Sequence, residues 1–426
     1  MAAVPILEEL SGSASGRMIG GFANMADAPM PPSLVEQVMS RRERRLSIYP
    51  ATAGFELVEE LDFLAARSIE PNIFFNPRFL APAMPRLEDR DVRLAVIRDG
   101  DEVRSRLRLL VPFTVEKPSV PFATPHLRTW ANPFAPLGTP LVDRDDPARV
   151  IEDFFEMLAR PHLKLPKVFV MPEVRLDGPF ASMVRSLADS RNLPVETANA
   201  AERAFIESDL DGDAYLRNSL RSHHLREFRR LKRKLEEKGA VEHTVARQPD
   251  EVRFAVEAFL ALEASGWKGR ARTAMAIDRF QAAFAREAVQ RLAEKDMCRV
   301  HTLTLEGLPI AVIIVFIEHG VAYTWKTAYD EEYAAYSPGT LLMIEVTRSH
   351  LEDPNVTVTD SCAVPDNQIM NRLWSERRQL GILVIGLTPD AARQTRQTAH
   401  ELQRTEQVRS FARGLRDKAK RLLKRT

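Results

Sequence analysis

The sequence predicts a mixed α/β protein made of two successive units. Its 426 residues suggest two or three domains. In the second half, amphipathic helical periods at 250–265 and 278–294 precede three apolar stretches of strand length. These stretches, at 299–305, 310–317 and 321–328, are separated only by short turns containing Gly307 or Gly320 and therefore predict an antiparallel meander.

The first predicted unit spans residues 51–200. It opens with a helical period that starts at Phe55, and a later helix follows at 180–190. The strands that we expect between them are 92–97, 107–113 and 167–171. Residues 1–50, with Met-Pro-Pro and a charge run, predict a flexible leader outside the fold.

The second predicted unit spans residues 201–388. It begins with one long basic helix, 213–238, which ends at Gly239. After the meander we expect a helix from Pro338, a strand at 356–359, a helix at 370–378 and a final strand at 382–385.

Composition and charge argue against several classes of protein. The formal charge of +1 argues against a chain that coats nucleic acid, and two cysteines do not support a disulfide framework. The longest apolar run, 310–317, is much shorter than the roughly 20 residues of a membrane-spanning helix, and the amino terminus lacks the pattern of a secretory signal. We expect a cytoplasmic protein with no metal site.

A helix start follows the meander in Tyr336-Ser-Pro-Gly-Thr-Leu-Leu. The unpaired N–H groups and positive dipole of such an end attract an anion such as a pyrophosphate. An ordinary helix start with proline in its first turn is the alternative.

Three runs together resemble a known family: Leu303-Thr-Leu-Glu-Gly-Leu-Pro-Ile-Ala, Trp325-Lys-Thr-Ala-Tyr-Asp-Glu-Glu-Tyr, and the helix start at Tyr336. They look like the GNAT-superfamily acyltransferases of the cellulose-biosynthesis acetyltransferase family, over about 190 residues. The resemblance implies tandem GNAT-like domains in a bacterial enzyme of polysaccharide or envelope synthesis, with a degenerate first copy and the acyl-CoA site in the second. It implies acyl-CoA as co-substrate, with no permanently bound cofactor, held by Ser337, Pro338, Gly339 and Thr340.

The sequence departs from that family after the strand at 356–359. Asp360-Ser-Cys-Ala leads directly to Asn371-Arg-Leu-Trp, without the glycines and lysine of many members. Arg372 is therefore the candidate for the role that the missing lysine plays toward the acceptor.

Acylation of an alkyl ammonium requires its deprotonation, so carboxylates near the acyl group are candidate bases. Asp330, Glu263 and Asp360 lie where this fold would converge on its cleft, although a solvated loop or a turn cap also explains an isolated carboxylate. Tyr336 is the preferred acid for protonating the departing thiolate. A covalent role for Cys362 is the weaker alternative, since no histidine lies near it in the sequence.

Substrate-binding candidates are Trp267, Lys268, Lys326 and Arg372. Lys326 stands inside an otherwise apolar and aromatic strand, where a lysine must reach water, form a pair or lower its pKa. It is a candidate for binding an anionic substrate or a coenzyme phosphate, with a solvent-facing strand position as the alternative.

The tail at 389–426 is rich in Arg and Lys, with apolar residues at helical spacing. It predicts either an amphipathic helix, which would contact the inner face of the membrane peripherally, or a disordered segment.

The leading function is acyl-CoA-dependent N-acylation of an amine on an envelope precursor, either a polysaccharide sugar or a lipid base. A Fem-type ligase using aminoacyl-tRNA, which the basic helix would contact, and a non-catalytic GNAT-fold protein of envelope assembly are the alternatives.

Overall fold

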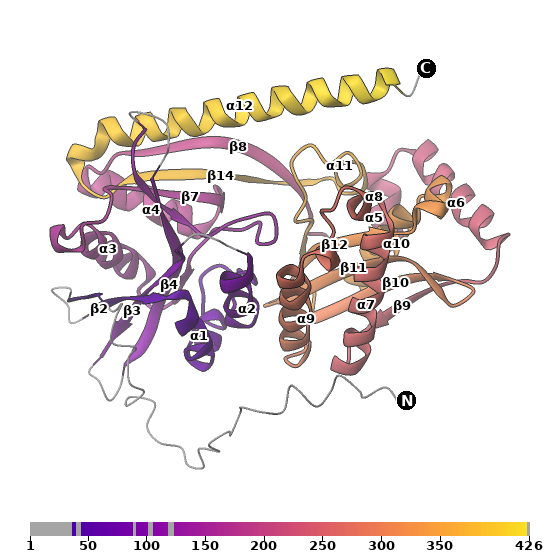
Figure 1. Ribbon diagram of the computed structural model, residues 1–426, viewed down its shortest axis with the longest axis horizontal. Helices are drawn as coiled ribbons and strands as arrows, with labels where there is room; N and C mark the ends of the chain where they lie inside the picture. Colours follow the sequence, from indigo (N-terminus) through magenta and orange to yellow (C-terminus); the bar gives the residue numbers. More distant parts are fainter. Residues whose placement is uncertain (1–35, 40–43, 88–90, 101–104, 118–122, 424–426) are drawn as a thin grey trace, which may run out of the picture.

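One mixed sheet runs through the whole molecule (Figure 1). The computed structural model describes residues 36–39, 44–87, 91–100, 105–117 and 123–423, with side chains up to residue 410. Within these residues the sheet has 14 strands in the order β1-β2-β3-β4-β5-β7-β14-β8-β13-β12-β11-β10-β9, with β6 paired to β4. The strands are β1 Glu36–Met39, β2 Arg45–Pro50, β3 Arg93–Asp99, β4 Arg106–Glu116, β5 His126–Thr129, β6 Leu141–Val142, β7 Val168–Arg175, β8 Val195–Ile206, β9 Val241–Ala246, β10 Cys298–Leu305, β11 Leu308–Glu318, β12 Val321–Tyr329, β13 Val358–Asp360 and β14 Glu376–Gly386.

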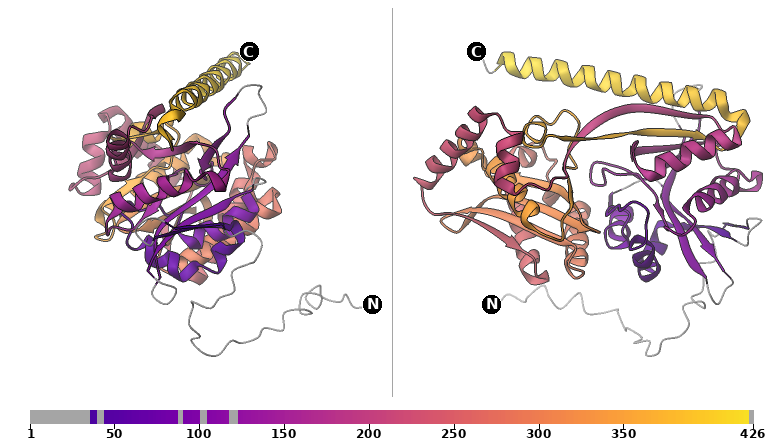
Figure 2. Two further views of the ribbon diagram at one scale, coloured as in Figure 1. Left: turned by 90° about the vertical axis from the view of Figure 1, so that its left-hand side faces the viewer. Right: turned by 180° about the vertical axis from the view of Figure 1, so that it is seen from behind.

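Helices cover both faces of this sheet, as the views from the side and from behind show (Figure 2). Two have clear local causes: Gln248 forms a capping box at the start of α7, and the Asp278 carboxylate accepts the N–H of Phe280 at the start of α9. The α-helices are α1 Val58–Ala65, α2 Pro77–Leu87, α3 Pro147–Leu158, α4 Pro179–Arg191, α5 Gly212–Ser219, α6 Ser222–Glu236, α7 Pro249–Ser265, α8 Trp267–Arg270, α9 Arg279–Ala293, α10 Pro338–Glu352, α11 Met370–Leu373 and α12 Ala392–Leu423.

The two halves of the chain repeat one strand arrangement. In the first half β5 pairs in parallel with β7 and is followed by α3 in the chain. In the second half β12 pairs in parallel with β13 and is followed by α10. This repetition agrees with the predicted tandem α/β fold class, in which helices flank a mixed sheet.

Strands β8 and β14 join the two halves. β14 pairs with β7 of the first half and with β8, while β8 also pairs with β13 of the second half. The hydrogen bonds of the sheet therefore continue across the seam between the halves (Figure 1).

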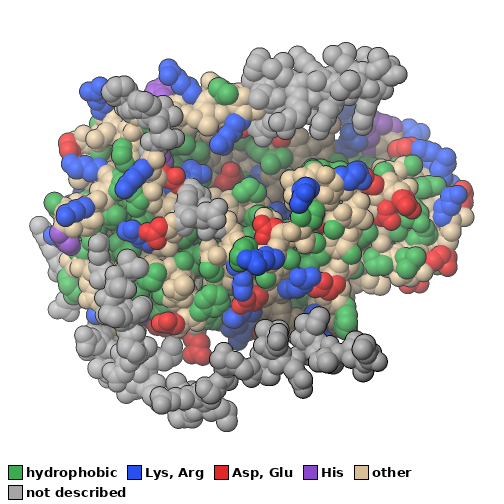
Figure 3. All heavy atoms as spheres, viewed as in Figure 1, with side chains coloured by type: hydrophobic (Ala, Val, Ile, Leu, Met, Phe, Trp, Pro, Cys, Tyr) green, Lys and Arg blue, Asp and Glu red, His purple; other side chains and the backbone are tan. Residues whose placement is uncertain are grey.

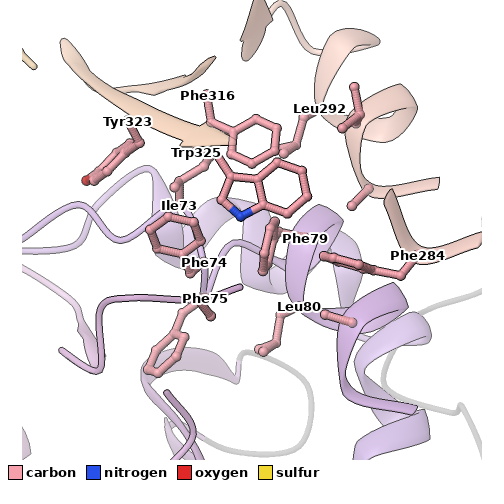
Figure 4. Packing of buried hydrophobic residues seen from close by; sticks show 14 of the residues in the cluster. Ile73, Phe74, Phe75, Phe79, Leu80, Phe284, Leu292, Phe316, Tyr323 and Trp325 are labelled. Carbon is pink, nitrogen blue, oxygen red and sulfur yellow. The ribbon is translucent and has the colours of Figure 1, made fainter. Parts of the chain in front are cut away.

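A shared aromatic core packs against this seam (Figure 4). Phe79 on α2 contacts Phe284 on α9 edge to face, with ring centroids 5.2 Å apart, and Trp325 on β12 at 5.9 Å. A polar contact joins the same elements, because the buried Asn76 donates from Nδ2 to Glu318 Oε1 at 2.8 Å. The halves are thus held together by apolar packing and by a buried hydrogen bond.

Three expectations about secondary structure need correction. Residues 1–50 are not all outside the fold, because Arg45–Pro50 pairs with β3 and is largely buried; residues 1–35 lie outside the described part. The predicted helix 213–238 is divided into α5 and α6, since Leu220 has an extended backbone and ends α5. The predicted helix 370–378 stops at Leu373, and the following residues begin β14.

The tail is helical, as the first of the two alternatives predicted. α12 packs against the sheet through Ala399 and Leu402, which contact a small cluster that includes Val384 of β14. Within the described residues no helix combines the length and the apolar character that crossing a membrane requires.

Candidate active site

The candidate site lies where two parallel strands separate. β12 and β13 pair from Val321 to Tyr323 on the first strand, and β13 ends at Asp360. β12 continues for six more residues to Tyr329, with a bulge at Trp325 that breaks its register with β11. The edge of β12 beyond Tyr323 is therefore open to another partner.

Helix α10 begins near the end of this open strand. Ser337, the residue before the helix, adopts a left-handed conformation (φ 54°, ψ 51°), and no side chain caps the first turn. Gly339 lies beside Tyr329 of β12, because a Cβ at this glycine would come 3.4 Å from the Tyr329 ring. The uncapped first turn thus offers N–H groups and a positive dipole end beside the open strand.

The first half contains the counterpart of this helix start, with different chemistry. Asp146 before α3 has nearly the same conformation as Ser337 (φ 56°, ψ 44°), and a proline follows in both cases. The Asp146 carboxylate pairs with Arg44 at 3.1 Å, and Arg44 also pairs with the buried Asp153. The negative charge of Asp146 at this helix start makes the site unfavourable for a phosphate.

A loop of the first half, residues 130–137, covers the bulge of β12. We call it the bridging loop. Trp325 Nε1 donates to Phe134 O at 2.7 Å, and Lys326 Nζ donates to Pro133 O at 3.1 Å. Arg203 of β8 donates to Pro136 O at 3.0 Å. Both halves therefore contribute to the site.

Lys326 is the candidate with the most perturbed titration. Burial, together with the positive charge of Lys268, lowers its pKa to about 8 against the opposing effect of Glu263. The ammonium lies 4.4 Å from the centroid of the Phe134 ring, a favourable cation–π geometry. Lys326 thus points into the interface with the bridging loop and is only partly exposed.

The buried Glu263 and the half-buried Lys268 form an ion pair beside Lys326. Lys268 Nζ contacts Glu263 Oε1 at 2.7 Å, and Glu263 Oε2 accepts the N–H of Met275 at 2.8 Å. Both carboxylate oxygens of Glu263 are therefore engaged, which gives this residue a structural role in holding the segment after α7.

Trp267 and the loop that leads to α10 are linked through Glu331. The Trp267 N–H donates to Glu331 Oε1 at 2.7 Å, and Arg270 pairs with the other oxygen. The Trp267 side chain is 56% exposed. This link places the exposed indole next to the predicted coenzyme side of the site.

Asp330 and Tyr336 bound the short helix between β12 and α10. Asp330 Oδ1 accepts the N–H of Glu332 at 2.9 Å, so this carboxylate caps the short helix. Tyr336 is partly buried against the core that contains Leu341 and Leu342. Both side chains belong to the segment that precedes the uncapped helix start.

Asp360 ends β13 in a buried ionic cluster. It lies 3.8 Å from Arg203 and accepts the N–H of Cys362 at 2.7 Å. Arg203 also pairs with Glu173 of β7 at 2.9 Å. Burial raises the pKa of the Cys362 thiol, which disfavours the thiolate that a covalent acyl carrier needs.

The structure gathers most of the predicted residues and leaves one apart. Lys268 and Lys326 share the site with Glu263, whereas Arg372 is exposed on α11, which contacts α5 on another part of the molecule. Sequence reasoning missed Arg203, whose signal was an arginine between Glu202 and Ala204 in a strand-like run. In the described part of the chain there is no group of three or more His, Cys, Asp or Glu side chains arranged to hold a metal.

Comparison with known proteins agrees with this geometry. Residues 222–363 match the family model described as an acetyltransferase (GNAT) domain, which contains β12, α10 and β13. The second half of the chain therefore includes a GNAT-type acetyltransferase domain. None of the curated proteins is similar enough in sequence to count as a match.

Three solved structures share the fold over nearly their whole length. A crystal structure of FemX is 10% identical, with a TM-score of 0.52, covering 80% of this chain and 98% of that one. The carboxy-terminal domain of a putative lysylphosphatidylglycerol synthetase from Agrobacterium fabrum is 12% identical, with a TM-score of 0.50 and coverages of 80% and 94%. A protein of unknown function from Bacteroides thetaiotaomicron is 11% identical, with a TM-score of 0.50 and coverages of 78% and 97%. At these identities the likeness shows the fold alone.

Proposed function

We propose that the protein is an acyl-CoA-dependent N-acyltransferase whose acceptor is an amine on a cell-envelope precursor, either a polysaccharide sugar or a lipid base. The observation that carries the proposal is the uncapped start of α10 beside the open edge of β12, within the segment that matches the GNAT family. The pyrophosphate of the coenzyme would bind at Ser337, Gly339 and Thr340, with Pro338 fixing the helix start.

The transfer step needs a free amine and a leaving thiolate. The amine nitrogen attacks the thioester carbonyl, a C–N bond forms and the C–S bond breaks. Asp330 accepts the proton of the attacking amine, and Tyr336 donates its proton to the thiolate. Glu263 and Asp360, the other two candidate bases, act through their partners Lys268 and Arg203 by holding the walls of the site.

We assign acceptor binding to three residues of the second half. Lys326 contacts the bridging loop, Lys268 lies close enough to Lys326 to affect its pKa, and the exposed Trp267 adjoins Lys268 in the chain, so the three offer cationic and aromatic contacts. Arg372 is exposed on α11, and no contact among the described residues joins it to these three side chains, so it is assigned no role toward the acceptor here.

The proposed envelope acceptor draws support from one fold neighbour, since it is named as a putative lysylphosphatidylglycerol synthetase. The similarity in fold to FemX leaves a second candidate function, that of a Fem-type ligase that takes its acyl group from aminoacyl-tRNA. On the face in Figure 3, Lys and Arg side chains are interspersed with Asp and Glu, which favours the coenzyme over an RNA donor.

Thermal unfolding with acetyl-CoA, a long-chain acyl-CoA and free CoA tests the donor, because a ligand of the folded state raises the midpoint. Gly339→Glu places a negative charge at the helix start and should abolish the shift. Gly339→Ala is the matched control, since its Cβ meets only the Tyr329 ring at 3.4 Å and should keep the shift.

No shift of the wild-type protein with any of the three coenzymes would overturn the proposal. Salt-sensitive binding of RNA without coenzyme binding would support the Fem-type candidate. Binding of neither ligand would favour the third alternative, a non-catalytic protein of envelope assembly.

A further inference from the structure

Two arginines with no role in the proposed reaction lie on one face of the sheet at the seam between the halves. Arg378 of β14 is directly opposite Arg203 of β8, and Leu380 of β14 is opposite Arg175 of β7. Side chains directly opposite each other share a face, and residues two apart on a strand do too. Arg175 and Arg378 therefore face the same side as Arg203, toward the candidate site.

Arg378 is buried and Arg175 is partly exposed, and both guanidinium groups have few partners. Only 7% of the Arg378 side chain is exposed, yet within the described residues its guanidinium makes no hydrogen bond, and its nearest carboxylate oxygen, on Glu207, is 3.9 Å away. Arg175 Nε is also buried without a hydrogen-bond partner in the described part of the chain. Arg203, in contrast, has four acceptors or ion-pair partners: Glu173, Asp360, Pro136 O and Ala363 O.

The surrounding acidic groups compensate this positive charge only in part, because Asp360, whose charge favours the charged form of Arg378, is shared with Arg203. Glu70 is buried, but Oε1 accepts the N–H of Phe180, Oε2 has no partner among the described residues, and burial raises the pKa of its carboxyl. Glu207 and Asp177 are exposed to solvent. Burial lowers the pKa of Arg378, and repulsion from Arg175 lowers it further, so the two guanidinium groups are close enough to repel each other.

An aromatic ring completes the arrangement. The Arg378 guanidinium carbon lies 4.3 Å from the centroid of the Phe205 ring, and Phe205 is partly exposed outside the hydrophobic core clusters. Burying the Arg378 guanidinium without a hydrogen bond is costly, and an oxyanion between Arg378 and Arg175 would offset that cost through charge-assisted hydrogen bonds. A dianionic phosphate matches two arginines better in charge than a carboxylate does.

We infer that Arg175 and Arg378 form an anion site for a phosphate group of the acceptor, so that the acceptor is a phosphate ester. This inference rests on the proposed acyl transfer and names the class of acceptor for it. The phosphate group of the acceptor binds at the seam between Arg175 and Arg378, next to Arg203. Its amine group then reaches the open edge of β12.

The test is thermal unfolding of the full chain with inorganic phosphate, against chloride and acetate at equal ionic strength. We expect the wild-type midpoint to rise with phosphate concentration and Arg378→Gln to weaken the apparent affinity for phosphate at least about ten-fold. Without phosphate, Arg378→Gln should be no less stable than wild type, because an uncompensated buried charge is removed. Arg175→Gln is the second variant, at a more exposed position.

The same measurement with acetyl-CoA separates this inference from the proposed function. Arg378→Gln should retain the acetyl-CoA shift, and Gly339→Glu should retain the phosphate shift. Equal phosphate responses of wild type and both arginine variants would overturn the inference. So would loss of acetyl-CoA binding in Arg378→Gln, since the site would then serve the phosphates of the donor.

Discussion

Asn76 and Glu318 form a buried hydrogen bond between the two halves of the chain, from Asn76 Nδ2 to Glu318 Oε1 at 2.8 Å. The second carboxyl oxygen, Oε2, has no partner in the described part of the molecule. Burial raises the pKa of Glu318 from 4.5 to about 7, against the opposing effect of the Asn76 hydrogen bond. The folded state therefore favours the protonated carboxyl.

The first prediction concerns pH and stability. The pKa of Glu318 is higher in the folded state than in the unfolded state. Below pH 4.5 the carboxyl is protonated in both states, so its burial carries no charge penalty. As the pH rises from 4.5 toward about 7, the unfolded state releases its proton first, and the free energy of unfolding falls. We expect this group to lower the free energy of unfolding by roughly 1–3 kcal/mol between pH 4.5 and pH 8. Glu318→Gln should remove this part of the pH dependence in urea unfolding.

Asn76→Ala is the companion variant for that measurement. It removes the donor that stabilises the carboxylate, so the folded pKa should rise further, and the loss of stability with rising pH should be larger and extend to higher pH than in wild type. Identical pH dependence in wild type and Glu318→Gln would contradict the assignment.

A second prediction concerns the shared aromatic core. Phe79→Ala removes a buried ring that contacts Phe74, Phe284 and Trp325 (Figure 4), and we expect a loss of about 3–5 kcal/mol in the free energy of unfolding. Phe254→Ala is the control, because Phe254 is 70% exposed and its removal should cost about 0.5 kcal/mol or less. Similar losses for the two variants, measured by urea unfolding, would argue against this packing.

A third prediction concerns Lys326. With a pKa of about 8, this lysine is a cation below pH 8 and loses its charge above it. If it binds an anionic group of a substrate, KM should rise above pH 8 in wild type. Lys326→Arg keeps the charge throughout, so its KM should stay flat over the same range. A wild-type KM that does not change across pH 8 would exclude this role.

A fourth prediction concerns Asp330. Asn also accepts a capping hydrogen bond, so Asp330→Asn should unfold like wild type while acyl transfer falls about 10²- to 10⁴-fold, as expected for loss of a general base. Glu332→Gln, an exposed neighbour, should leave the rate unchanged. Equal rates of acyl transfer in Asp330→Asn and wild type would mean that Asp330 acts only as a helix cap.

Periodicity predicted the second half well because its elements are regular and its turns are marked. The meander strands 299–305, 310–317 and 321–328 differ from β10, β11 and β12 by no more than two residues at either end. α7 and α9 also agree with their predicted ranges, since each begins at a polar capping residue, Gln248 and Asp278.

The elements that the sequence did not reveal depend on tertiary contacts. α2 contains Pro82 and Pro85, which local rules exclude from a helix, yet its apolar face packs against α9. β9 is a half-exposed edge strand without a continuous apolar pattern.

The sequence predicted part of the candidate site and missed the part that depends on tertiary contacts. The helix start at Ser337 is visible in the sequence because proline and glycine mark it. The bridging loop and Arg203 are separated from Trp325 by more than a hundred residues, so only the folded chain shows that they meet. The domain boundaries and the assignment to the cellulose-biosynthesis branch stay predictions.

The long strands β8 and β14 limit how this protein can move and how it can be divided. A cleft between separate domains opens by rotation about a flexible linker, whereas here such a rotation would have to twist or break a continuous backbone ladder. Separating the halves would leave each with a bare strand edge, which invites aggregation. Opening of the site by rotation of one half against the other is therefore disfavoured, and neither half is expected to be stable when expressed alone.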